Sequence, residues 1–425
     1  MTLLAEAPTA LRPRVARPAR VAWGAGAVVL GTAIGLIRQP GIGALDTVWA
    51  EDGRDFLSTA TNHSILDAIG TSYAGYFHLV PRLLAATATL APPRAAGAVL
   101  AVAAAACVAL VAVLVWVASA AHLRSPLSRA ILASVVVLLP LGQTDVLNSI
   151  ANLQWYGLFA LFWVLIWSPA SRTGQVVAAV VVVLVAGSDI LVLAFVPLAL
   201  WRALRRPRSP YATVLAALLG LGLAWQVGGL VVGSSSREMQ PDPVLAVTGY
   251  LIRAVPAGLI GERWLGESVD TGWVLLAGVA WLLVAAAVLA AWLRITRPSW
   301  PLALTAAVHS AALYALPVLL SGVATPRYAV APALLALTAL AALLQPRETG
   351  AAALAPLGAL AGLLAVVCAV NLRIDNERAH GPRWSDELNR ARAGCATTGG
   401  GTAELTVSPG GQDWRTRLPC RYVLR

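Results

Sequence analysis

The sequence predicts an all-α membrane protein that crosses the bilayer many times. Hydrophobic residues make up 58% of the 425 residues, and only 12% are charged. The mean hydropathy is +0.74, and many apolar runs approach the roughly 20 residues that a helix needs to cross a hydrocarbon core about 30 Å thick. A soluble chain of this length would expose far more charge, so this composition excludes a soluble enzyme.

About eleven apolar segments of residues 21–371 are expected to be transmembrane helices. We place them at 21–37, 95–121, 129–143, 155–168, 175–187, 189–203, 212–233, 272–293, 299–321, 325–344 and 351–371. Residues 1–20 are rich in Arg, Pro and Ala, which predicts disorder. Because no small-residue cleavage site follows them, the first apolar segment is interpreted as an uncleaved span and not as a signal peptide.

The arginines determine the expected orientation. The chain has no lysine, and the loops that alternate along it carry basic residues such as Arg124, Arg172, Arg202 and Arg297. The positive-inside rule assigns these loops to the cytoplasm. We therefore expect a multi-pass plasma membrane protein with a cytoplasmic N-terminus and an extracytoplasmic C-terminus. The same rule accounts for the net charge of +11, which consequently does not indicate nucleic acid as a partner.

The tail, residues 372–425, is the only stretch with a water-soluble composition. Ser385 is a favourable N-cap for a helix over 386–392, and two short strands are expected around the Pro-Gly-Gly turn that starts at Pro409. The tail is thus predicted to be a small extracytoplasmic α+β domain.

The four cysteines fall into two groups. Cys107 and Cys368 lie inside apolar spans and are interpreted as small buried hydrophobic residues. Cys395 and Cys420 lie in the tail and form the only plausible disulfide pair. Such a bridge suits an oxidising outer compartment and would stabilise the tail by about 3–4 kcal/mol, which a domain this small needs.

The outer loop, residues 38–94, carries an acidic stretch directly after the first span. Its carboxylates are Asp46, Glu51, Asp52 and Asp55. In a regular helix Asp52 shares a face with aromatic residues, whereas Glu51 and Asp55 share a neighbouring face. Like charges four residues apart destabilise a helix, so the stretch needs a cation, an arginine or a substrate as a partner. The alternative is an acidic first turn that faces solvent.

A second part of the outer loop could bind phosphate. Tyr76 and His78 precede an apolar run that is too short to be a span, and we interpret this run as a helix in the membrane interface. If Pro81 is the first residue of that helix, Arg82 lies in its first turn, where an anion is favoured. The alternative is an interfacial arginine that extends toward the headgroups.

Other polar residues are expected at the same outer surface. Arg327 and Tyr328 begin a late span at its outer end, and an arginine there departs from the positive-inside trend. It has either an anionic partner or a role as an aromatic-belt anchor. Asp55 is a candidate for lining the same cavity. Four further residues are candidates too, with helix caps or interface positions as the alternative: Asn152, Gln154, Trp155 and Asp189.

This layout resembles the C-type membrane glycosyltransferases (GT-C), which use sugars on polyprenyl-phosphate carriers. The resemblance rests on the pair Glu51-Asp52 after the first span, Phe56 four residues after Asp52, the segment from Tyr76 to Arg82, and Arg327-Tyr328. The chain is similar in outline to mannosyl-, arabinosyl- and aminoarabinosyl-transferases and to actinobacterial membrane proteins with Glu-Asp-Gly in this loop. It departs from the family in the order of its acidic pair, and it has a small tail in place of the large soluble domain that some members carry.

The resemblance implies an inverting transfer of a sugar to a glycan or protein acceptor of the cell envelope. Asp52 or Glu51 would be the base, and Arg82 and Arg327 would stabilise the leaving lipid phosphate. The phosphate site would also include Tyr76, His78 and Tyr328. A divalent metal held by Glu51 and Asp55 is compatible with this chemistry but not required by it, and no other cofactor is implied.

Two other functions fit the composition. A transporter or flippase of a lipid-linked or anionic solute would use the same outer charges for binding, but it would need polar residues along the whole pathway. The middles of the spans are mostly Ala, Val and Leu. A non-catalytic envelope scaffold would tolerate alanine in place of Glu51 and Asp52.

Overall fold

The computed structural model describes residues 17–205, 209–233, 240–265, 269–348, 350–411 and 413–425. The disorder predicted for residues 1–16 lies outside the described residues. For residues 17–20 the prediction is wrong, because they form the first turn of a helix, Arg17–Arg38. The prediction of an all-α polytopic membrane protein is confirmed, because eight helices within the described residues are long and apolar enough to cross a membrane. They are Val21–Arg38, Pro93–Ala121, Pro210–Val232, Pro243–Ile260, Thr271–Trp292, Trp300–Ser321, Pro326–Leu343 and Ala351–Val370.

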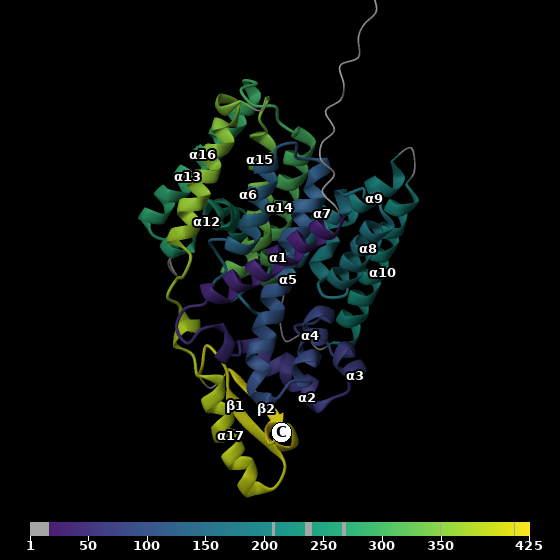
Figure 1. Cartoon of the computed structure of the whole chain (residues 1–425), viewed down its shortest axis with the longest axis vertical. Helices are drawn as coiled ribbons and strands as arrows, with labels where there is room; N and C mark the ends of the chain where they lie inside the picture. The colour runs from purple at the N-terminus through teal and green to yellow at the C-terminus, as the bar shows by residue number, and fades with distance from the viewer. Residues whose placement is uncertain (1–16, 206–208, 234–239, 266–268, 349, 412) are drawn as a thin grey trace, which may run out of the picture.

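Most of these spans coincide with labelled helices in Figure 1. The long ones are α1 (Arg17–Arg38), α5 (Ala96–Ala118), α10 (Pro210–Val232), α13 (Thr271–Trp292), α14 (Trp300–Ser321), α15 (Val330–Leu343) and α16 (Ala351–Val370). The sequence-based prediction missed the span Pro243–Ile260, which lies in a segment predicted to be an outer loop. It consists of α11 (Pro243–Gly249) and α12 (Val255–Ile260), joined by a π-helical turn. Its internal Gly249, Arg253 and Pro256 conceal the helical periodicity.

Four of the eleven predicted spans are shorter than a membrane crossing. They are α6 (Pro126–Leu138), α7 (Leu153–Ile166), α8 (Arg172–Ala186) and the helix Ile190–Leu204, which contains α9 (Val196–Leu204). At 1.5 Å per residue, the 14 residues of α7 extend only about 21 Å. Protein surrounds α7 on all sides, since every residue from Leu158 to Leu165 is buried. This central helix therefore packs against other helices and not against lipid.

The outer loop folds into short helices at one end of the molecule (Figure 1). These are α2 (Ser58–Asn62), α3 (Ile65–Gly70) and α4 (Leu79–Thr89), and a π-helical turn, Asp52–Leu57, precedes them. α4 occupies the run predicted to be an interfacial helix. It begins at Leu79, so Pro81 is its third residue. The sequence-based interpretation placed Pro81 first.

The tail has the predicted α+β composition. It contains α17 (Trp384–Thr398), the antiparallel strands β1 (Thr402–Thr406) and β2 (Arg415–Pro419), and α18 (Cys420–Val423). A disulfide joins Cys395 to Cys420. α17 begins one residue before Ser385, which is therefore not its N-cap. The backbone N–H and the hydroxyl of Ser385 instead donate to the two carboxylate oxygens of Asp46, each at 2.8 Å.

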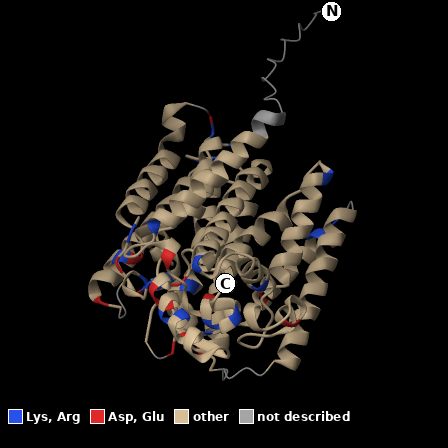
Figure 2. Cartoon of the chain, turned by 60° about the horizontal axis from the view of Figure 1, so that its bottom comes forward, with Lys and Arg blue, Asp and Glu red and all other residues tan. Residues whose placement is uncertain are grey.

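The tail and the outer loop share one hydrophobic core. Val48, Phe56 and Leu57 of the loop pack in the same cluster as Trp384 and Leu418 of the tail. The backbones also pair, because Ala50 N–H donates to Ser408 O at 2.6 Å and Ser408 N–H donates to Val48 O at 2.9 Å. In Figure 2 most acidic residues gather at this end, around the C-terminus, while the helices carry little charge. The tail thus forms one structural unit with the outer loop.

Candidate functional site

A cavity of about 290 Å³ lies where the outer loop meets the ends of several helices. Nine of the residues selected from the sequence line it. They are Glu51, Tyr76, His78, Asn152, Gln154, Trp155, Asp189, Arg327 and Tyr328. These residues come from segments up to about 280 positions apart, so only the fold brings them together.

The charged wall of the cavity is formed by Glu51 and Arg327, whose carboxylate oxygen and guanidinium nitrogen lie 3.5 Å apart. Glu51 directly follows the backbone pairing between the outer loop and the tail. Arg327 lies in the single 3₁₀ turn that Pro326 begins before α15. Asp145 adds negative charge near Arg327, and burial raises the pKa of its carboxyl group while Arg327 lowers it. The pair is partly solvent-accessible, so a ligand can reach both groups.

Aromatic residues form a second wall. The rings of Tyr76 and His78 stack at 4.2 Å, and the Tyr76 hydroxyl lies 3.3 Å from Gln154 Oε1. The rings of Trp155 and Tyr328 lie 5.3 Å apart. Flat, rigid side chains of this kind offer stacking faces to a sugar ring at a low cost in conformational entropy.

Asp189 contributes a buried carboxylate to the cavity. Its Oδ1 accepts a hydrogen bond from the Leu191 N–H at 2.8 Å, which caps the following turn. Its Oδ2 is buried and has no hydrogen-bond partner among the described residues. An unpaired buried acceptor is costly, so this oxygen favours a ligand that brings a donor group.

The remaining wall is apolar, and no sequence pattern indicates its residues as part of a site. It includes Leu230 at the end of α10 and Pro317 and Leu320 near the end of α14. These residues look like ordinary parts of spans. Tyr73 and Ser321 were also missed.

Asp52 does not line the cavity, although it is the neighbour of Glu51. Its carboxylate is 1% exposed and accepts hydrogen bonds from the Ser149 hydroxyl, Ile150 N–H and Ala151 N–H at 2.9–3.1 Å. Burial raises its pKa to about 7, against the effect of these backbone donors and of Arg378. Asp52 therefore anchors the loop at 149–151.

Arg378 and Arg82 are anchors of the same kind. Arg378 is 2% exposed, lies 4.9 Å from the centre of the Trp49 ring, and donates to the carbonyls of Leu147 and Asn148. We use the name clasp for Asp52, Arg82 and Arg378 together with the backbone groups that they bind.

Arg82 lies outside the cavity, contrary to the position expected for a phosphate ligand. Its guanidinium donates to the carbonyls of Asp55 at 3.0 Å and Thr71 at 3.3 Å, and it lies 4.8 Å from the centre of the Phe56 ring. Because α4 begins at Leu79, the side chain points into the outer loop. Arg82 therefore holds the loop together.

The structure offers little for a divalent metal at Glu51 and Asp55. The Asp55 carboxylate pairs with Arg54 at 3.0 Å, and Asp55 is not part of the cavity wall. Among the described residues, no group of three or more His, Cys, Asp or Glu side chains could hold a metal ion. These two carboxylates alone are too few ligands for a protein metal site.

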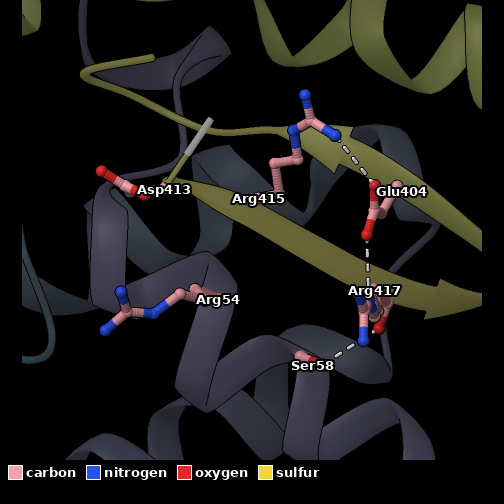
Figure 3. A pocket seen from close by; sticks show the side chains of 6 residues that line it. All are labelled: Arg54, Ser58, Glu404, Asp413, Arg415 and Arg417. Atoms are coloured by element: carbon pink, nitrogen blue, oxygen red, sulfur yellow. Dashed lines mark hydrogen bonds and ion pairs between the residues drawn. The ribbon is translucent and has the colours of Figure 1, made fainter. Parts of the chain in front are cut away.

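A second, polar hollow of about 640 Å³ separates the outer loop from the β1–β2 hairpin (Figure 3). Its lining residues are Arg54, Ser58, Glu404, Asp413, Arg415 and Arg417. Glu404 pairs with both Arg415 and Arg417, at 3.1 and 3.0 Å. Arg54 reaches the Tyr73 hydroxyl at 3.4 Å, and Tyr73 lines the cavity. The hollow and the cavity are therefore neighbours, joined by the contact between Arg54 and Tyr73.

The sequence matches no protein-family model and no curated protein.

Proposed function

We propose that this protein is a membrane glycosyltransferase of the GT-C type. It would move a sugar from a polyprenyl-phosphate carrier to an extracytoplasmic acceptor, with inversion at the anomeric carbon. The observation that carries the proposal is the pair of Glu51 and Arg327 in one cavity. A carboxylate and a guanidinium 3.5 Å apart supply the base and the anion-stabilising group that this transfer needs.

In the proposed step the acceptor hydroxyl gives its proton to the Glu51 carboxylate as its oxygen bonds to the anomeric carbon. The bond between that carbon and the phosphate oxygen breaks at the same time, and its electron pair stays on the lipid phosphate. Arg327 then leaves Glu51 and pairs with this developing charge. Its charge-assisted hydrogen bond to the phosphate is stronger in the transition state than in the bound substrate. We assign the base to Glu51 because the three hydrogen bonds of Asp52 occupy its carboxylate.

The other walls fit the two ends of such a donor. Leu230, Pro317 and Leu320 provide apolar contact for the first isoprenoid units, close to the bilayer that the neighbouring spans imply. Tyr76 and Trp155 provide stacking faces for the sugar, and Asp189 Oδ2 provides an acceptor for a sugar hydroxyl. A carrier phosphate between these regions would lie beside Arg327.

A transfer assay with purified full-length protein and radiolabelled polyprenyl-phosphate sugars tests the proposal. Glu51→Gln should lower turnover by a factor of about 10²–10⁴, the usual contribution of a general base. Asp67→Asn is the matched control, because Asp67 is an exposed acid of the same outer loop and Asn keeps a side-chain oxygen.

Full turnover in Glu51→Gln would remove Glu51 as the base. Transfer from a nucleotide sugar, with none from a lipid-linked sugar, would remove the proposed donor class.

A further inference from the structure

A third hollow, of about 730 Å³, lies at the opposite end of the helices from the cavity. It is lined by Ala291, Trp292, Arg294, Thr296, Arg297, Pro298, Trp300 and Arg347. α14 connects the two places, since Trp300 at its beginning lines the hollow and Ser321 at its end lines the cavity. Its 22 residues extend about 33 Å, so the hollow and the cavity lie near opposite faces of the membrane.

Hydrogen bonds connect the two segments that form the hollow, residues 296–299 and the end of α15. Arg297 N–H donates to Gln345 O at 2.8 Å, and Ser299 N–H donates to Ala342 O at 2.9 Å. The Thr296 hydroxyl donates to Leu343 O at 2.7 Å. These bonds join the α13–α14 turn to the end of α15, so the arginines project from a fixed platform.

The hollow is strongly basic. Arg294, Arg297 and Arg347 are exposed, and none of them forms an ion pair with an acid of the described residues. No Asp or Glu lines the hollow. Three unneutralised guanidinium groups around one depression attract a phosphate, which they can bind through several parallel hydrogen bonds.

The backbone at Arg294 adds a second observation. Its φ angle is 59°, in the left-handed region where glycine is strongly favoured over other residues. Glycine would form this turn with less strain. An arginine in its place has a cost in stability, and such strain is typical of functional positions.

The surroundings of the hollow are those of a lipid headgroup. Trp292 is 75% exposed, and Trp300 lies on the other side of the turn. Leu289 and Leu293 are also exposed, at 55% and 60%. Tryptophan beside exposed leucine, next to arginine, is the pattern found at the boundary between hydrocarbon and headgroups.

We propose that this hollow is a binding site for the phosphate headgroup of an anionic phospholipid. Arg294, Arg297 and Arg347 bind the phosphate, while Trp292 and Trp300 contact the glycerol and upper acyl region. The orientation predicted from the sequence puts the site in the cytoplasmic leaflet. The proposal is independent of the glycosyltransferase function, because it concerns the other end of α14 and α15.

Native mass spectrometry of the detergent-purified full-length protein tests this site. The probes are dioleoyl phosphatidylglycerol, dioleoyl phosphatidylcholine and inorganic phosphate. Arg294→Gln combined with Arg347→Gln should weaken phosphatidylglycerol binding roughly 25-fold, since each arginine near an anionic headgroup contributes about fivefold. The matched control is Arg172→Gln with Arg205→Gln, because both are exposed arginines at the ends of α8 and α9 and neither lines the hollow.

Arg294→Gly separates binding from folding. Glycine suits the left-handed backbone, so the melting temperature should stay unchanged or rise while phosphatidylglycerol binding weakens about fivefold. An equal loss in the control pair would show diffuse surface attraction and overturn the site. Equal binding of phosphatidylcholine, or equally tight binding of inorganic phosphate, would overturn an anionic lipid as the ligand.

Discussion

The cavity and the clasp use the same side chains, carboxylates and arginines, for opposite purposes. In the clasp, Asp52, Arg82 and Arg378 are each at most 2% exposed and bind mainly backbone groups. In the cavity, Glu51 and Arg327 retain some solvent exposure and pair with each other across 3.5 Å. The backbone partners of the clasp cannot leave, whereas the cavity pair can exchange partners with a ligand. The type of partner, and not the type of residue, separates an anchor from a reactive group.

The largest expected effect contrasts the two arginines that the sequence assigned to phosphate. Arg327→Gln should lower transfer by a factor of about 10²–10³, because it removes a preorganised donor to the leaving group. Arg82→Gln should instead lower the melting temperature, because it removes donors to the backbone carbonyls of Asp55 and Thr71. Turnover and thermal unfolding are measured on both variants. A loss of turnover in Arg82→Gln without a loss of stability would instead assign the phosphate site to Arg82 on α4.

The disulfide tests how strongly the tail supports the cavity. Cys395→Ser with Cys420→Ser should destabilise the tail by about 3–4 kcal/mol on the chain-entropy relation. Because the tail and the outer loop share a core, the transfer rate should fall as well. Denaturant unfolding measures the first effect, with Cys107→Ser as the control. Mass-tag labelling of the native protein should leave Cys395 and Cys420 unmodified, and reactive thiols at these positions would contradict the bridge.

Neighbouring carboxylates should separate stability from turnover. Asp52→Asn places an amide NH₂ against the Ile150 or Ala151 N–H, so we expect a destabilisation of about 2–3 kcal/mol. Glu51→Gln should change the free energy of unfolding by about 1 kcal/mol or less, because a partly solvent-accessible ion pair contributes little to stability. Equilibrium unfolding in detergent measures both. Equal destabilisation by the two substitutions would place Glu51 in the clasp.

The smallest effect is a pH dependence of stability. Burial raises the pKa of Asp52 from 3.8 to about 7, so between these values the folded protein binds more protons than the unfolded chain. Stability must then fall as the pH rises, by roughly 1 kcal/mol between pH 6 and pH 7. Asp52→Asn should remove this part of the slope. The part that remains is expected from Glu262 and Asp189, because burial also raises the pKa of each to about 7.

The sequence predicted the positions of most helices but not which residues meet in the cavity. The apolar runs of α5, α10 and α13 differ from their predicted bounds by only a few residues. A regular helix of 3.6 residues per turn places Asp52 on the aromatic face and Glu51 on a neighbouring face. The structure has a π-helical turn at Asp52–Leu57, and its wider winding changes which side chains share a face.

Composition and hydrophobic runs by themselves determined the membrane class and most of its helices, because the cost of transferring a segment into lipid is a sum over its own residues. Only the tertiary structure decided that Glu51 faces the cavity, that Asp52 anchors a loop and that the tail belongs to the outer loop. Those outcomes depend on contacts between distant segments, such as Ser385 with Asp46, which are 339 positions apart. Local sequence patterns contain no information about such pairs.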